Sequence, residues 1–132
     1  MTSEEATLAA RRLGEVVEHV RLLASDADIQ DAWLHPCGWT RRQRFTHVAV
    51  HPPCAPVAEL VDSFFDVWPA WRALLSPTLP AGGGAALDRL AAFLQTLDAS
   101  AYRDEIETLD GEQWMEVRRL ASETDQQLSH PR

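Results

Sequence analysis

The sequence predicts a mainly α-helical domain: a bundle of five to six helices with an irregular segment around residues 36–54. Three observations predict this class. Apolar residues recur at three- and four-residue steps over most of the chain, which is the spacing of one helix face. Residues that begin or end helices stand between these stretches. The length of 132 residues, with 45% apolar and 24% charged side chains, fits one globular domain over residues 1–132.

The first helix is predicted over residues 3–24. Its apolar stripe consists of Leu13, Val16, Val17, Val20 and Leu23. Thr2 and Glu5 have the spacing of a capping box, in which the hydroxyl and the carboxylate each accept from a free backbone amide. This pair therefore predicts where the helix begins.

A second, shorter helix is predicted directly afterwards. Ser25 and Asp28 repeat the capping-box spacing. The apolar residues Ile29, Trp33 and Leu34 are then expected to face inward. The following His-Pro dipeptide ends the helix, because a residue before proline disfavours helical backbone angles.

The irregular segment contains one candidate strand, residues 45–50, which is rich in residues with β preference. Because a single strand needs a partner and none is evident, an extended loop is the better interpretation. A helix is predicted over residues 55–67, and Pro69 is placed to start the next short helix. Residues 76–84 are predicted to be a Pro/Gly-rich internal loop.

The last third of the chain predicts a helix over residues 85–97, then an ambiguous stretch to residue 110 that is either a short helix or a loop. The final helix is predicted from residue 110 or 111 to residue 128, with Trp114 and Val117 facing inward. Residues 129–132 are expected to fray.

The charge balance restricts the partners. Twenty carboxylates face twelve arginines and no lysine, so the net charge at neutral pH is −8. That charge disfavours nucleic acid, because binding to phosphates depends on cationic side chains. It suits a basic protein partner through electrostatic steering, although an acidic surface can also serve solubility alone. The exclusive use of arginine indicates a GC-rich, bacterial genome.

The same composition predicts no membrane partner, because no apolar run approaches the roughly 18 residues that cross a bilayer. The acidic N-terminal residues differ from a signal peptide, so a cytoplasmic location is expected. Two cysteines are too few for a disulfide framework, and free thiols are expected.

The irregular segment carries residue types that bind zinc, namely His35, Cys37, His47, His51 and Cys54. Two histidines four residues apart share a face only on a helix, however, and the residues between them favour extended backbone. The segment also lacks a Cys-x-x-Cys pair. We therefore predict no metal and no cofactor, with a metal site on this His/Cys loop as the alternative.

Catalytic motifs are not evident elsewhere. No serine or cysteine lies in a nucleophile elbow, and the triple glycine at 82–84 lacks the lysine and spacing of a phosphate-binding loop. Nucleophilic and nucleotide chemistry are therefore unsupported, and we predict that the protein is not an enzyme.

Two acidic groups are candidate docking surfaces for a cationic partner. The first contains Asp104, Glu105, Glu107, Asp110, Glu112 and Glu116, and the second is the pair Asp62 and Asp66. Carboxylates can also act as acid and base or bind magnesium. Nothing in the spacing brings these carboxylates together in a cleft, and a solvated face is the simpler interpretation.

The five tryptophans divide into two kinds. Four fall in apolar helical patterns and are predicted to belong to the core, namely Trp33, Trp68, Trp71 and Trp114. Trp39 instead lies beside a cluster of three arginines, and aromatic residues next to arginine are typical of interface hot spots. Trp39 is therefore a candidate partner contact, with closure of the core under the loop as the equal alternative.

Residues 20–34, VRLLASDADIQDAWL, resemble a pattern of small bacterial immunity proteins of the contact-dependent inhibition, or polymorphic toxin, type and of related families. In that pattern a leucine-rich helix end is followed by Ser-Asp and Gln-x-x-Trp, here Ser25, Asp26, Gln30 and Trp33. Residues 56–66, PVAELVDSFFD, are similar to a helix of the same group. The later helices follow in a compatible order.

The resemblance implies a non-enzymatic immunity protein that binds a cognate toxin domain and occludes its active site. An acidic helical face would mimic the phosphates that a nuclease toxin expects. The resemblance carries over no catalytic residues. Two alternatives remain open from the residues: a small metal-binding protein or enzyme that uses the His/Cys loop, and a homodimeric regulatory module.

Overall fold

The computed structural model describes residues 2–34, 57–98 and 106–129 of the chain. Its α-helices are α1 (Ser3–Ala24), α2 (Ala27–Leu34), α4 (Ala58–Val67), α5 (Arg72–Leu75), α6 (Gly83–Gln95), α7 (Ile106–Leu109) and α8 (Glu112–Ser129). Two short 3-10 helices, η1 (Pro69–Trp71) and η2 (Ser76–Thr78), flank α5. The predicted mainly α-helical bundle is confirmed. The irregular segment 36–54, including its candidate strand, and the tail residues 130–132 lie outside the described residues.

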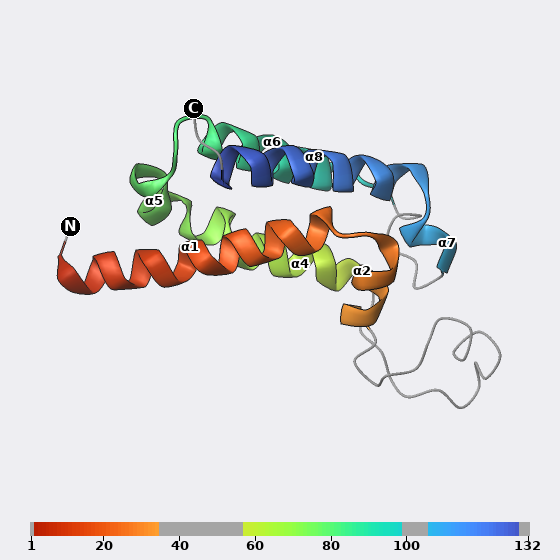
Figure 1. Ribbon diagram of the computed structural model, residues 1–132, viewed down its shortest axis with the longest axis horizontal. Coiled ribbons are helices and arrows are strands. Elements are labelled where there is room, and N and C mark those ends of the chain that lie inside the picture. Colours follow the sequence, from red (N-terminus) through yellow and green to blue (C-terminus); the bar gives the residue numbers. More distant parts are fainter. Residues whose placement is uncertain (1, 35–56, 99–105, 130–132) are drawn as a thin grey trace.

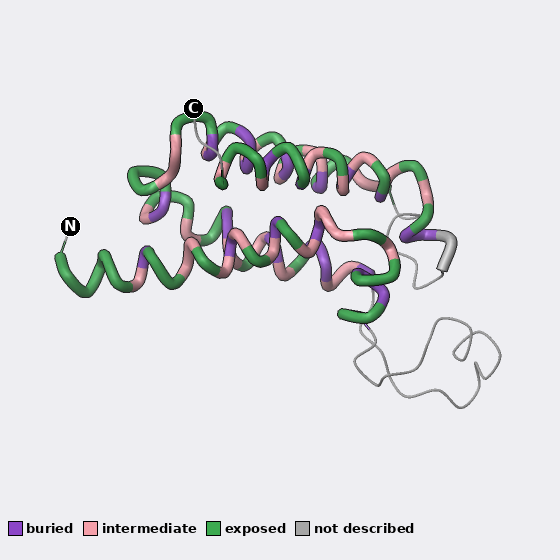
Figure 2. The backbone as a smooth tube through the Cα atoms, in the orientation of Figure 1, coloured by how far each residue is buried: buried purple, intermediate pink, exposed green. Residues whose placement is uncertain are grey.

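The long helices form two layers (Figure 1). α1 packs beside α4, and α6 packs beside α8, while α1 also packs against α8 across the two layers. The short helix α2 follows α1 and contacts both α4 and α7. The buried residues lie mainly along the sides of the helices that face the other layer (Figure 2). The largest fully buried side chains include Trp68, Trp114, Phe64, Leu23, Leu60, Leu87 and Leu90.

Local sequence signals explain how α1 begins. The backbone amide of Glu5 donates to the Thr2 hydroxyl at 3.1 Å, and the amide of Thr2 donates to the Glu5 carboxylate at 3.3 Å. This is the predicted capping box, and α1 has the predicted bounds. Among the described helices, none is both long and apolar enough to cross a membrane.

The second predicted capping box is wrong. The carboxylate that accepts from the first turn of α2 belongs to Asp26, which receives the amide of Ile29 at 3.0 Å. The Ser25 hydroxyl instead donates to the carbonyl of Arg21 at 2.7 Å, so it closes the end of α1. Ser25 and Asp26 could each cap α2 by their residue type. Because the Ser25 hydroxyl is bonded to the last turn of α1, Asp26 is the residue that caps α2.

The inward orientation predicted for α2 is only partly correct. Leu34 is buried, but Ile29 is 53% exposed and Trp33 is 41% exposed. The side of α2 that is buried carries polar residues, Gln30 and Asp31, along with Leu34. Trp33, one of the four tryptophans predicted to belong to the core, therefore lies at the surface.

The predicted loop over residues 76–84 is wrong in part, because η2 and the first two residues of α6 lie within it. Gly82 has a positive φ of 84°, a conformation that glycine adopts at little cost. Gly83 is buried, and a Cβ there would lie 3.1 Å from a methyl group of Leu128. The glycines therefore let the start of α6 approach the end of α8.

A buried glutamine joins four helices. Gln30, which is fully buried, donates through its side-chain amide to the carbonyls of Leu22 at 3.2 Å and Leu23 at 3.0 Å. Its oxygen accepts from Nη1 of Arg118 at 3.0 Å, and the same nitrogen donates to the carbonyl of Leu109 at 2.7 Å. Through this network α2 is fixed to the end of α1, to α7 and to α8.

Replacing Gln30 by leucine should therefore lower the free energy of unfolding by at least about 2 kcal/mol, because each buried polar group left without a partner costs about 1–3 kcal/mol. Urea unfolding followed by circular dichroism measures the change. The control is Gln126→Leu at an exposed position of α8, which should stay within about 0.5 kcal/mol of the wild type. Equal losses for the two variants would show that the network contributes nothing.

Candidate functional site: a groove between α1 and α4

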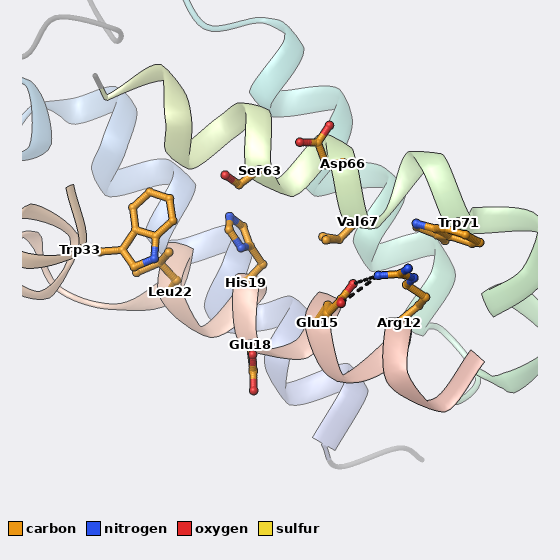
Figure 3. Close-up of a pocket in the computed structure, with 10 residues that line it drawn as sticks. All are labelled: Arg12, Glu15, Glu18, His19, Leu22, Trp33, Ser63, Asp66, Val67 and Trp71. Atoms are coloured by element: carbon orange, nitrogen blue, oxygen red, sulfur yellow. Dashed lines mark hydrogen bonds and ion pairs between the residues drawn. The ribbon is translucent and has the colours of Figure 1, made fainter. Parts of the chain in front are cut away.

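A groove of about 620 Å³ runs between α1 and α4, with α2 at one end and η1 at the other (Figure 3). Its volume falls within the roughly 300–1,000 Å³ of typical ligand pockets. α1 contributes most of the polar lining, namely Arg12, Glu15, Glu18 and His19. α4 contributes Ser63 and Asp66, and Trp33 and Trp71 stand at the two ends, while the Glu18 side chain points away from α4.

The end formed with η1 already holds a cation. The guanidinium of Arg12 lies over the ring of Trp71, 4.7 Å from its centroid. Nη1 of Arg12 donates to both carboxylate oxygens of Glu15 at 2.9 Å. A cation between an aromatic ring and a carboxylate is stabilised by the ring quadrupole and by the ion pair together.

The end formed with α2 places a second indole ring against an imidazole. The rings of His19 and Trp33 meet edge to face, with 6.0 Å between their centroids. Burial lowers the pKa of His19, while a hydrogen bond with the Leu60 backbone and the charge of Asp66 act in the opposite direction. The imidazole is therefore neutral at neutral pH, and a neutral imidazole offers one nitrogen as an acceptor.

Two polar atoms of this groove are short of partners. Nε of Arg12 and Nε2 of His19 are buried and have no hydrogen-bond partner, and they are the only such side-chain atoms within the described residues. Each unpaired buried atom costs about 1–3 kcal/mol, so native proteins rarely keep one without a reason. Both belong to side chains that line the same groove.

Carboxylates on this side of the molecule are only partly neutralised. Within the described chain, Glu15 is the groove carboxylate that pairs with an arginine. Glu18 and Asp66 make no such ion pair there, and neither does the exposed Asp62, one helical turn from Asp66. α4 itself contains no cationic residue. The α1/α4 groove is therefore an electronegative site.

The acidic group predicted near α8 is more compensated. Arg119 forms ion pairs with both Glu116 and Glu123, and the first of these lowers the pKa of Glu116. The charge of Asp110 acts on Arg118. Glu112 is exposed in the first turn of α8. Two arginines thus offset part of this negative surface, whereas no arginine of the described chain forms an ion pair with a carboxylate of α4.

Several predicted residues lie outside the described residues: Asp104, Glu105, Trp39 and the five residues of the His/Cys loop. Glu107 belongs to α7. The metal alternative on the His/Cys loop therefore stays a prediction. Elsewhere, the described residues hold no cluster of three or more metal-ligating side chains.

Sequence reasoning missed most of the groove. It singled out none of Arg12, Glu15, Glu18 and His19 as functional residues. One signal was available: His19 lies between Val16 and Val20, at the border of the apolar stripe, where a polar side chain is half-buried. Asp66 was predicted as a docking residue, and the structure places it in the groove.

The lowered pKa of His19 makes stability depend on pH. Unfolded histidine binds a proton near pH 6.5, whereas the folded ring binds one only at lower pH, so acid favours the unfolded state. The contribution of His19 to the free energy of unfolding is complete above the unfolded pKa of about 6.5. It is lost as the pH falls from there through the lower pKa of the folded state. The charged groups that line the groove with His19 are Arg12, Glu15, Glu18 and Asp66.

We therefore expect wild type to lose more stability than His19→Gln when the pH falls from 7.5 to 5.5. Urea unfolding at three pH values measures this difference, and the other four histidines, present in both proteins, cancel in the comparison. Parallel curves for the two proteins would contradict a buried, neutral His19.

Comparison of the chain with protein-family models, curated proteins and solved structures gives no match.

Proposed function

We propose that the chain is a non-catalytic binding protein for a basic protein partner, and specifically an immunity protein that occludes a cognate bacterial toxin domain. The partner docks on the α1/α4 groove and on the adjacent Asp62. The observation that carries the proposal is the groove itself: its lining includes Glu18 and Asp66, which lack arginine partners in the described chain, and Trp33 at one end is 41% exposed.

Physical chemistry supports this choice of partner. A net charge of −8 attracts a basic surface over long distance and accelerates encounter. An exposed tryptophan next to charged groups is typical of interface hot spots. The similarity of residues 20–34 to immunity proteins points to the same class, and a protein that works by occupying another protein's site needs shape and charge rather than a reaction centre.

Co-expression tests the proposal. The neighbouring reading frame is expected to end in a toxin domain, which is expressed with and without this chain. Cells should survive only with the chain, and the two proteins should elute as one complex in size-exclusion chromatography. If cells that make the folded chain still die, and the chain and the toxin domain form no complex, the immunity function is rejected. Light scattering of the chain alone at two concentrations tests the homodimer alternative.

A further inference from the structure

We propose that the outer face of α2, which carries Ile29 and Trp33, is the apolar anchor of the docking surface. Its occupant is a segment of the protein partner whose apolar side chains are flanked by lysine or arginine. This inference rests on the proposed function and adds the chemistry that the partner must present. It follows from the orientation of α2, which is the reverse of what its residue types favour.

The buried side of α2 is largely polar. Gln30 and Asp31 are buried, while Ile29 and Trp33 are two of the three large apolar side chains that the described residues expose. The hydrophobic effect favours the opposite orientation, in which apolar surface is removed from water and polar side chains are left in it. Exposed apolar surface on so short a helix therefore requires an explanation.

A hydrogen-bond network holds α2 in this orientation. The fully buried Gln30 side chain donates to two backbone carbonyls at the end of α1 and accepts from Arg118 of α8. Rotating α2 about its axis, so that Ile29 and Trp33 turned inward, would take Gln30 away from all three groups. Buried polar groups would then lack partners, which costs free energy. The network therefore keeps the apolar face turned outward.

The apolar face of α2 joins the groove. Ile29 and Trp33 are one helical turn apart and so share one side of α2. Trp33 also lines the α2 end of the groove, whose lining includes the apolar side chains of Leu22 and Val67 (Figure 3). Exposed apolar surface of this kind on a folded protein marks an interaction site. Trp33 thus connects the apolar face of α2 with the proposed docking groove.

The charge around this surface selects the partner. α2 and α4 contact each other, and neither contains a cationic residue. Glu59, Asp62 and Asp66 of α4 form no ion pair with an arginine of the described chain. Cationic side chains beside the apolar ones of the partner would meet opposite charge here, whereas carboxylates would be repelled. The expected occupant is therefore both apolar and basic.

Nuclear magnetic resonance on the full chain tests this inference. The probe is acetyl-Leu-Lys-Lys-Leu-Leu-Lys-Lys-Leu-amide, whose leucines fall on one helix face. Its control is the same peptide with glutamate in place of every lysine. We expect saturable shifts of the Ile29 methyl and Trp33 indole signals, with a dissociation constant on the order of 1 mM. The glutamate peptide should bind at least about tenfold more weakly, because the carboxylates of α4 repel it.

Three alanine variants localise the effect, after circular dichroism has shown that each is folded. Trp33→Ala should weaken the lysine peptide about tenfold and Ile29→Ala about threefold, because each removes apolar contact area. Leu8→Ala is the control, since Leu8 is half-buried and lies near the opposite end of α1 from α2. It should leave the affinity unchanged. Equal binding of both peptides, unchanged affinity of Trp33→Ala, or no shifts of Ile29 and Trp33 would each overturn the apolar anchor.

These outcomes are separable from the proposed function. If the toxin domain is neutralised but the lysine peptide does not bind at α2, the partner docks elsewhere and only this inference fails. If the peptide binds at α2 but no toxin is neutralised, the immunity function fails while the apolar anchor stands.

Discussion

Replacing Trp114 by alanine is expected to lower the free energy of unfolding by about 3–5 kcal/mol, the usual cost of deleting a large buried aromatic side chain. Trp114 has no exposed surface and lies in α8, which packs against both α1 and α6. Its removal leaves a cavity at the junction of the two helix layers. A small domain has only about 5–15 kcal/mol of stability, so this variant is expected to be marginal.

Trp33→Ala is the matched control, since the sequence predicts both tryptophans to be core residues. Trp33 is 41% exposed and packs only edge to face on His19, so its loss should cost at most about 2 kcal/mol. Urea unfolding of the two variants measures the difference. A cost at Trp33 as large as that at Trp114 would mean that α2 is packed differently.

The helices could be predicted from the sequence because their signals are local. The apolar stripe of α1 and the Thr2–Glu5 pair lie within one helix, so the neighbouring elements were not needed to recognise them. The same holds for Pro69, which begins η1 as predicted. Signals of this kind set where an element starts and which of its faces is apolar.

Features that depend on neighbouring elements could not be predicted. Gly83 lies at the start of α6, where a Cβ would be 3.1 Å from a methyl group of Leu128 in α8, and nothing within residues 76–84 indicates that close approach. Ile29 and Trp33 looked like core residues, but the neighbours of α2 bury its Gln30 side instead. An apolar side chain thus identifies a candidate for burial, while packing decides which candidates are buried.

The candidate site shows the same division. Asp62 and Asp66 were recognised as a docking pair because they share one face of one helix. The groove combines residues from α1, α2, α4 and η1, which are as far as 59 positions apart in the sequence, from Arg12 to Trp71. Only the tertiary structure brings His19 beside Trp33 and Asp66.

The central claim is that a basic protein partner binds at the α1/α4 groove, and two matched charge reversals test it most directly. Asp62→Arg with Asp66→Arg changes α4, and Glu112→Arg with Glu116→Arg changes α8. Each pair is spaced four residues apart and raises the net charge by the same amount. The measurement is the rate at which each variant associates with the free toxin domain that the wild-type chain neutralises, at low and at high salt. Circular dichroism first shows that both variants are folded.

We expect the α4 pair to slow association about 10- to 100-fold at low salt, because it reverses the steering charge at the docking surface. The α8 pair should change the rate only about threefold, through net charge alone, since none of the residues that line the groove belongs to α8. Equal slowing by both pairs, or a larger effect of the α8 pair, would contradict docking at the α1/α4 groove.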